Sequence, residues 1–180
     1  MIATGADLWH ALDQLAGTDD AEHRAFMHRL GKGWGRRWTE RVDGWVQQRH
    51  GRTLRELELH AALEALSGSI GALGLGRFDV DLGQRDRGVL LVLHRHSPFD
   101  SLLAARDAGR HDLLAGLHAG FFSYLSGRDL EARVVGVGDG LVKIAAATSP
   151  RLEHLFATDP TPEDARWLAR HGAVELAAHG

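Results

Sequence analysis

Hydrophobic residues recur at helical spacing in three segments of the first 70 residues. The first segment covers residues 6–16, and the second follows it and continues as far as Trp45. The third runs from Leu54 to Leu66. Thr53 directly precedes it and has a glutamate three residues later, which is the spacing of a capping box. Apolar residues at intervals of three and four are typical of helices with one buried face, so this part of the chain is predicted to form three helices.

Alternation of apolar and polar residues then predicts two antiparallel hairpins. In the first, phenylalanine, valine and leucine alternate with aspartates, and a polar turn leads to a short aliphatic run. In the second, two apolar stretches flank a Gly-Asp-Gly turn, whose glycines accept positive backbone dihedrals. The strands are predicted over residues 78–82 and 89–93 in the first hairpin and over residues 130–137 and 141–147 in the second.

Two further helices complete the predicted order. One covers residues 111–125 between the hairpins, and Thr161 caps a last helix that extends to about Ala178. The order ααα-ββ-α-ββ-α favours an α+β fold, in which helices pack on antiparallel hairpins. We expect residues 1–149 to form a single α+β domain with an N-terminal helical segment, and residues 150–180 to form a C-terminal helical extension.

Composition narrows the classes of function. The 180 residues are the length of one domain, and the absence of cysteine excludes disulfides, thiolate metal sites and cysteine nucleophiles. The net charge is -3 and the basic residues are scattered, which argues against a nucleic-acid-binding protein. The longest aliphatic run is five residues, too short to span a membrane. The N-terminus lacks the basic start and apolar centre of a secretory signal, so we predict a cytoplasmic protein.

The second predicted helix contains three glycines within five residues, at Gly31, Gly33 and Gly35. Each glycine costs a helix about 1 kcal/mol relative to alanine, so we expect another helix to approach closely and offset the loss. A break in the helix is the alternative. A phosphate-binding loop is not expected, because no strand precedes these residues and no serine or threonine follows the lysine.

Candidate chemistry is sparse elsewhere. His94 and His96 are two residues apart, a spacing that puts both imidazoles of a strand on one face. A zinc site needs a third ligand and usually a fourth, so we interpret the pair as a partly exposed strand end without a metal. We expect Asp79 and Asp81 to be solvated residues on the polar face of a strand. No serine lies in a nucleophile elbow, and the sequence predicts neither an enzyme nor a cofactor site.

The sharpest local feature is a stripe of tryptophans. Trp34, Trp38 and Trp45 are spaced by four and then seven residues. At 100° per residue they lie within about 40° on one helix face, beside Arg37 and Arg41. Indole rings combine a large apolar area with a polar N–H. The stripe therefore suits the protein core, a subunit interface or stacking against sugar rings, and the sequence leaves these roles open.

Five segments succeed one another in a recognisable order. They are Leu30–Arg37, Thr53–Leu59, Gly74–Val80, His94–Pro98 and Leu113–Phe122. They correspond to a glycine-punctuated helix, a leucine-rich helix, a glycine-bearing bend, a hairpin that ends in histidine and proline, and a further helix. This succession resembles the BcsD family, which is encoded in the cellulose synthase operon, over roughly residues 20–147. No single motif is diagnostic.

The resemblance implies a non-catalytic accessory subunit of bacterial cellulose synthesis. Family members are α+β dimers that assemble into a ring-shaped octamer, whose passages guide glucan chains. The implied partners are further copies of the chain, subunits of the cellulose synthase complex and the glucan, and the resemblance leaves a periplasmic location open. In the family the N-terminal segment lines the passage, so Trp9 joins the tryptophan stripe and its two arginines as a polysaccharide or interface candidate. Residues 150–180 depart from the family pattern.

A second resemblance supports an alternative function. Residues 113–147 are also similar to small-molecule-binding domains related to the vinyl-reductase family and, more distantly, to haem-based gas sensors. Such domains enclose an apolar ligand. The cysteines often found near the end of the vinyl-reductase pattern are absent here, so we place this small-molecule or haem-binding sensor second.

Overall fold

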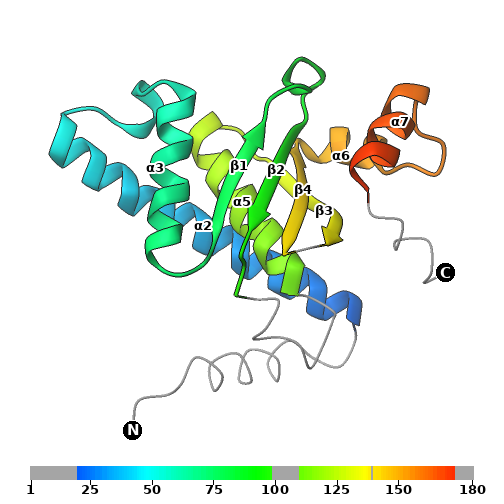
Figure 1. Ribbon diagram of the computed structural model, residues 1–180, viewed down its shortest axis with the longest axis horizontal. Helices are drawn as coiled ribbons and strands as arrows, with labels where there is room; N and C mark the ends of the chain where they lie inside the picture. Colours follow the sequence, from blue (N-terminus) through cyan, green and yellow to red (C-terminus); the bar gives the residue numbers. More distant parts are fainter. Residues whose placement is uncertain (1–19, 99–109, 139, 173–180) are drawn as a thin grey trace, which may run out of the picture.

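The chain has an α+β fold, with helices packed on one antiparallel sheet (Figure 1). The computed structural model describes residues 20–98, 110–138 and 140–172. The predicted helix over residues 6–16, which includes Trp9, lies outside the described residues. The helices are α2 (Asp20–His50), α3 (Leu59–Ala72), α5 (Arg110–Ser126), α6 (Ser149–Leu155) and α7 (Pro162–His171), and the strands are β1 (Arg77–Asp81), β2 (Leu90–Arg95), β3 (Glu131–Gly138) and β4 (Leu141–Ala147).

Both predicted hairpins are present and lie side by side in the sheet. The strand order is β1-β2-β4-β3, so the pairing of β2 with β4 joins one hairpin to the other. Alternate residues face opposite sides: Val92 packs with the helices α2, α3 and α5, whereas Leu91 packs with the C-terminal helices. An irregularity between Val134 and Gly136 shifts the register of β3 against β4. The sheet therefore separates two apolar clusters.

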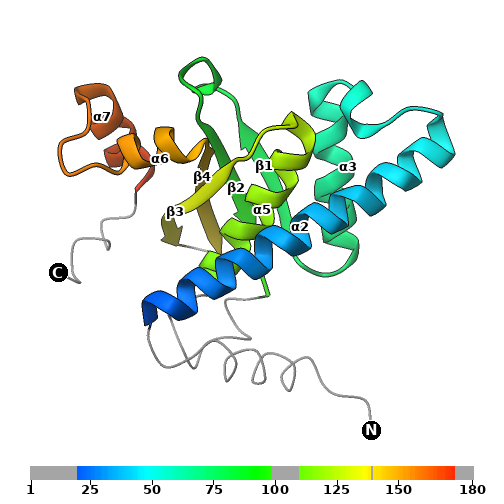
Figure 2. The same cartoon turned by 180° about the vertical axis from the view of Figure 1, so that it is seen from behind.

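Helix α5 lies between the sheet and α2 (Figure 2). Every residue from Leu113 to Phe122 is buried. This stretch is apolar on all sides except for His118, which is typical of a helix that other elements surround completely. The main apolar cluster forms around it and includes Val92 and Ile144 of the sheet.

The glycines of α2 account for its close contact with α5. A β-carbon added to Gly31 would overlap the carbonyl oxygen of Leu113, and one added to Gly35 would overlap that of Leu117. Helix α2 continues through this region without a break, as the expected helix contact requires. Gly33 does not share this role, because a β-carbon there would meet only the end of a flexible arginine side chain.

Helix α5 contributes two glycines of its own to the contact. A β-carbon on Gly116 would overlap the carbonyl oxygen of His28, and one on Gly120 would overlap that of Lys32. Backbone therefore packs against backbone in both directions. The contact between the two helices compensates for the low helix propensity of glycine.

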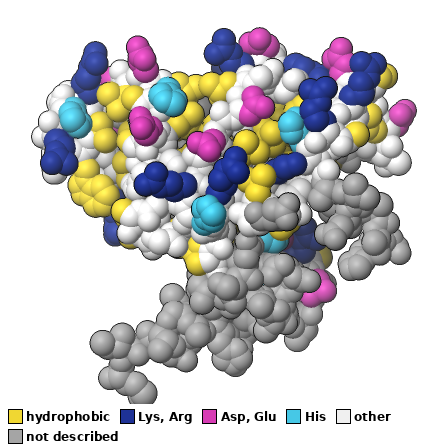
Figure 3. Space-filling model, viewed as in Figure 1, with side chains coloured by type: hydrophobic (Ala, Val, Ile, Leu, Met, Phe, Trp, Pro, Cys, Tyr) yellow, Lys and Arg dark blue, Asp and Glu magenta, His cyan; other side chains and the backbone are white. Residues whose placement is uncertain are grey.

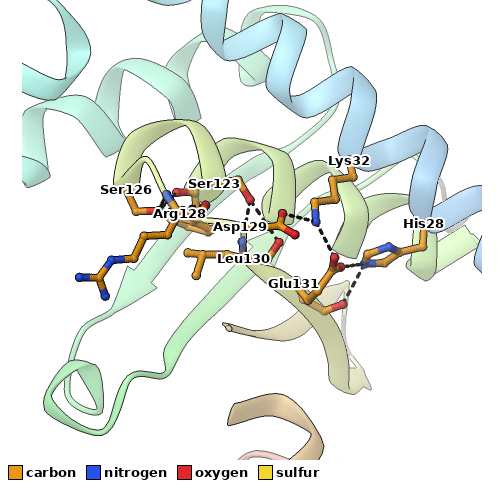
Figure 4. A network of polar contacts seen from close by, with 10 residues as sticks. His28, Lys32, Ser123, Ser126, Arg128, Asp129, Leu130 and Glu131 are labelled. Carbon is orange, nitrogen blue, oxygen red and sulfur yellow. Dashed lines mark hydrogen bonds and ion pairs between the residues drawn. The ribbon is translucent and has the colours of Figure 1, made fainter. Parts of the chain in front are cut away.

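A polar network also fixes α2 to the chain that leaves α5 and enters β3 (Figure 4). Lys32 Nζ donates hydrogen bonds to Asp129 Oδ1 at 2.7 Å and to Glu131 Oε1 at 2.5 Å. His28 Nε2 donates to the carbonyl oxygen of Ala132 at 3.1 Å and lies 3.6 Å from Glu131 Oε2. Partial burial opposes the charged form of Lys32, but the hydrogen bonds and charges of the two carboxylates outweigh it and raise the pKa of Lys32.

The third helix begins later than the sequence predicted. The capping box is present, since the Glu56 carboxylate accepts hydrogen bonds from the Thr53 N–H at 2.6 Å and the Thr53 hydroxyl at 2.9 Å, which lower the pKa of Glu56. It caps a single 3₁₀ turn, Leu54–Glu56, and α3 starts only at Leu59. The turn is separate from α3 because the chain is extended at Leu57. The Leu54 N–H donates to Asp43 Oδ1 at 2.5 Å, which ties the start of the turn to α2.

The C-terminal helices cover the outer side of the sheet. Trp167 of α7 is buried in the second apolar cluster with Leu91 and Ala145. Thr161 caps α7 as predicted, because its hydroxyl accepts the Asp164 N–H at 3.2 Å. Helix α6 was not predicted, since its seven residues are too few to show a helical period. The predicted division of the chain after residue 149 falls at the start of α6 and stays a prediction.

Helix α2, at 31 residues, is the longest element described. Charged residues occur along most of its length. None of the described helices has both the length and the apolar character that crossing a membrane requires.

Candidate functional site

The predicted tryptophan stripe divides into a half-buried part and an exposed part. Trp34 and Trp38 are half-buried and pack against the main apolar cluster. The Trp38 Nε1–H donates to Ser69 Oγ of α3 at 3.0 Å. Trp45 is 53% exposed and meets Trp38 edge-on, with ring centroids 5.6 Å apart and planes at 86°. Core packing therefore describes the first two tryptophans, while an interface or a polysaccharide contact stays open for Trp45.

The exposed tryptophan is surrounded by positive charge. Arg41 and Arg49 lie one helical turn before and after Trp45, and Arg37 lies one turn further back. All three arginines are exposed. None of them forms an ion pair with another residue of the described chain. Planar guanidinium groups beside an indole can stack on a flat partner or bind carboxylates, whereas bond-making chemistry would need other groups.

The path of α2 explains why Trp45 is exposed. Val42 is the last buried residue of the helix, which then continues to His50 away from α5 (Figure 1). Asp43 anchors the start of this extension, because its Oδ2 accepts the Tyr124 hydroxyl at 2.7 Å. Burial, together with the hydrogen bond and charge of Asp43, raises the pKa of Tyr124 to about 12. The start of the extension is thus fixed to α5, and Val46 still packs against the main apolar cluster, while Trp45 beside it is exposed.

The structure also brings together two buried histidines that the sequence pattern did not associate. His94 of β2 donates from Nε2 to the carbonyl oxygen of Leu75 at 2.9 Å. Its Nδ1 therefore accepts from His118 Nε2 of α5, at 3.0 Å. The His118 ring lies edge-on to Phe78 at 4.8 Å and to Phe121 at 5.6 Å, measured between centroids. The pair links β2, α5 and the turn after α3 within the core.

His118 presents an unusual atom to this core. Its Nδ1 has no hydrogen-bond partner among the described residues. Burial, with a smaller contribution from the neighbouring His94, holds the pKa of His118 well below its ordinary value, so the ring is neutral. One signal in the sequence could have indicated this position, because His118 is the one polar residue in the otherwise apolar stretch Leu113–Phe122.

The paired-histidine prediction is wrong for one residue. His94 is fully buried, not part of an exposed strand end, because it lies on the inner side of the sheet. His96 follows the strand, is exposed and has a φ of 57°, so it does not continue the alternation. Asp79 and Asp81 are exposed, as predicted. Among the described residues, no three histidine or carboxylate side chains are grouped so that they could hold a metal ion.

A shallow depression of about 620 Å³ lies between the turn before β2 and the C-terminal helices. Among its lining residues, the buried Asp164 carboxylate accepts hydrogen bonds from Arg151 at 2.6 and 3.1 Å and from Arg87 at 2.8 Å. The Arg151 hydrogen bonds are the main reason why the pKa of Asp164 is lowered. Both arginines are engaged by this carboxylate, so the cluster docks α7 and does not form a free anion site. The depression is lined by Arg87, Thr148, Pro150, Arg151, His154, Thr161 and Asp164.

Comparison with known proteins identifies fold neighbours only. The sequence matches no model of a protein family and no curated protein. The structure is similar to subunit 3 of the trafficking protein particle complex from Naegleria fowleri, covalently bound to palmitic acid, with a TM-score of 0.55, 13% identity, and coverage of 79% of this chain and 89% of that one. It is also similar to the phenol-responsive sensory domain of the transcription activator PoxR with phenol, with a TM-score of 0.59, 17% identity, and coverage of 96% and 84%. At these identities the likeness concerns the fold.

Proposed function

We propose that this chain is a non-catalytic accessory subunit of bacterial cellulose synthesis, which self-associates and assists the export and ordering of glucan chains. The succession of five segments supports this proposal. Two of them, Leu30–Arg37 and Leu113–Phe122, contain the four glycines of the contact between α2 and α5. The resemblance thus falls on residues that determine how the subunit packs.

The observation that carries the proposal is the exposed part of the tryptophan stripe. Trp45 is 53% exposed, and the arginines one helical turn before and after it are exposed and form no ion pair with another described residue. A scaffold needs self-complementary surfaces and a few aromatic side chains toward its polymer, and it needs no nucleophile. We propose that it acts at the cytoplasmic side of the synthase complex, as a dimer that assembles into a larger ring. The periplasm is the alternative location.

The test uses a cellulose-producing bacterium that carries this chain. Replacing Trp45 with alanine is expected to reduce the alignment of cellulose fibrils more than the amount of cellulose, because synthesis itself does not depend on this subunit. Fibril order is measured by X-ray diffraction and yield by weight. Val137→Ala is the matched control, since Val137 is an exposed hydrophobic residue on β3, far along the chain from α2. A strain that lacks the chain and still makes equally ordered cellulose contradicts the proposal.

A small-molecule-binding sensor domain is the second candidate. Both fold neighbours are named with a small apolar ligand, palmitic acid in one and phenol in the other. The neutral His118 has a free acceptor nitrogen among aromatic rings, which suits a ligand with one hydroxyl group. This function predicts that phenol or palmitate raises the melting temperature of the purified protein, and that His118→Gln reduces the rise for phenol. The sensor function is contradicted if the purified protein is a monomer without the colour of a bound haem and neither phenol nor palmitate raises its melting temperature.

A further inference from the structure

The hydrogen bonds of the buried histidine pair all run in one direction. The carbonyl oxygen of Leu75 can only accept, so His94 donates to it from Nε2 at 2.9 Å. The other nitrogen of a neutral imidazole is then an acceptor, and His94 Nδ1 accepts from His118 Nε2 at 3.0 Å. By the same rule His118 Nδ1 carries no hydrogen. One backbone carbonyl therefore fixes the last nitrogen of this series as an acceptor.

This last acceptor lies in the core without a donor. The His118 side chain is 0% exposed, and its Nδ1 has no hydrogen-bond partner among the described residues. Buried polar atoms are almost always hydrogen-bonded, because an unsatisfied one destabilises the folded state. The nitrogen thus indicates a hydrogen-bond donor that the described residues do not supply.

The surroundings of His118 are aromatic. Its ring meets Phe78 and Phe121 edge-on, with centroids 4.8 and 5.6 Å away. It lies nearly parallel to Phe122, at 6.2 Å and with planes at 23°. All three phenylalanines are buried. A molecule that reaches Nδ1 therefore needs an apolar body to pack among these rings.

The buried surroundings of His118 also exclude an anion. Figure 3 shows acidic and basic side chains spread over the described part of the surface that it views. Among the buried side chains that the structure describes, none is a lysine or an arginine, and the one carboxylate, Asp164, belongs to α7 on the outer side of the sheet. The oxygen of a carboxylate would face the lone pair of Nδ1 with no buried cation to stabilise it.

We propose that His118 Nδ1 accepts a hydrogen bond from an uncharged, mostly apolar ligand that carries one O–H or N–H donor, the chemical class to which phenol belongs. This inference rests on the second candidate function, a small-molecule-binding domain, and adds to it the requirement for a donor. Because the Leu75 carbonyl fixes the direction of the hydrogen bonds, a ligand that offers only acceptors leaves Nδ1 unsatisfied.

Two ligands of nearly the same shape test this requirement on the full chain. Phenol is neutral at pH 7, and toluene has a methyl group in place of the hydroxyl. Phenol is expected to bind at least roughly tenfold more tightly than toluene, although toluene is more hydrophobic, because toluene leaves the buried nitrogen unpaired. Benzoate, an anion, is not expected to bind. Isothermal titration calorimetry measures the affinities, and toluene or benzoate binding as tightly as phenol overturns the inference.

The protonation of His118 can be measured without a variant. In ¹⁵N NMR spectra of the labelled protein, the ring proton of His118 is expected on Nε2, and phenol but not toluene is expected to shift the Nδ1 signal. A proton on Nδ1 in the free protein overturns the inference. An Nδ1 signal that is already at its hydrogen-bonded position before phenol is added also overturns it, because a buried water then supplies the donor.

A matched pair of variants assigns the preference to one residue. His118→Leu is expected to lower the affinity for phenol to that for toluene, whereas His60→Leu, the same substitution at an exposed position of α3, is expected to retain the preference. Circular dichroism and thermal melts establish that both variants are folded. If His118→Leu does not fold, the ligand comparison and the NMR spectra of the unmodified chain still decide the question.

The outcomes separate the donor requirement from the function on which it rests. Equal binding of phenol and toluene supports a small-molecule-binding domain and overturns the donor requirement. Binding of neither ligand contradicts both, and it leaves the proposed role in cellulose synthesis untouched.

Discussion

Up to Val42, helix α2 is pressed against α5, whereas beyond this residue it continues for two turns without a single buried position. Gly35, before Val42, faces the backbone of Leu117, while a β-carbon at Gly44, beyond Val42, would meet nothing within 4 Å. The three tryptophans of α2 differ in the same way, since Trp34 and Trp38 are half-buried and Trp45 is exposed. One helix can thus stabilise the subunit where another helix faces it and leave a surface for a partner where none does.

The largest expected effect comes from adding a side chain where α2 packs directly against the backbone of α5. Gly35→Ala is expected to lower the free energy of unfolding by about 3 kcal/mol, because the new methyl group meets the backbone carbonyl of Leu117 and neither helix backbone can yield locally. Urea denaturation followed by circular dichroism measures the change.

Gly44→Ala is the matched control in the part of the same helix beyond Val42. With open space around it, alanine is expected to raise the free energy of unfolding by about 0.5–1 kcal/mol through its higher helix propensity. Equal effects of the two substitutions would show that the close contact with α5 does not determine stability.

The next effect concerns His118, the buried histidine of α5 that is hydrogen-bonded to His94 of the sheet. The pKa of His118 is depressed in the folded chain, so the unfolded chain binds a proton first as the pH falls below the ordinary value of 6.5. Between pH 7.5 and pH 5 this group is expected to cost the folded state up to about 2 kcal/mol, which is 1.5 pH units at 1.36 kcal/mol each.

His118→Gln keeps an N–H donor for His94 but does not titrate. The stability advantage of the unmodified chain over this variant is therefore expected to shrink as the pH falls, in urea denaturation at several pH values. His50→Gln, at the exposed end of α2, is the same substitution outside the core and serves as the comparison. A pH-independent difference between the unmodified chain and His118→Gln would contradict the assigned protonation of the buried pair.

The smallest expected effects on the free energy of unfolding come from replacing two cations of α2, Lys32 and Arg36. Lys32→Met is expected to lower the free energy of unfolding by about 1 kcal/mol, because it removes the hydrogen bonds to Asp129 and Glu131. Arg36→Met removes only the exposed pair with Glu40 and is expected to cost about 0.3 kcal/mol. Thermal melts at low and high salt measure both, and a larger loss for Arg36→Met would contradict the role of the network in Figure 4.

The raised pKa of Lys32 adds a sign to this prediction. The stabilisation is fully present below the ordinary lysine pKa of 10.5 and is lost only as the pH rises through the higher folded value. The cost of Lys32→Met is therefore expected to be the same at pH 7 and pH 9. This distinguishes the lysine from His118, whose effect changes within the neutral range.

Local patterns predicted those parts of the fold that local energies determine. Phe78 and Val80 alternate with aspartates because one side of β1 is buried, and Gly31 and Gly35 required a closely packed helix to offset their low propensity. Periodicity also placed Trp38 and Trp45 on one face. It could not show where α5 ends along that face, so the sequence did not separate the half-buried residue from the exposed one.

Other features depend on contacts between distant segments and left no periodic signal. His94 meets His118 because β2 lies beneath α5, which follows from the order of strands in the sheet. The turn before α3 is held to α2 by the bond between Leu54 and Asp43, two residues on different elements. Helix α6 is too short for its period to be detected. Tertiary contacts decide each of these features, and the residues alone do not determine them.

The backbone contact between α2 and α5 also has a mechanical consequence. No side chain separates the two helices at the four glycines, so one cannot slide along the other without first being lifted away. The part of α2 beyond Val42 is therefore held in a fixed orientation relative to α5, and a partner bound to it would also be oriented relative to the sheet behind α5. In an assembly that uses this end of α2, the angle between subunits would therefore depend on the contact between α2 and α5, which lies within one subunit.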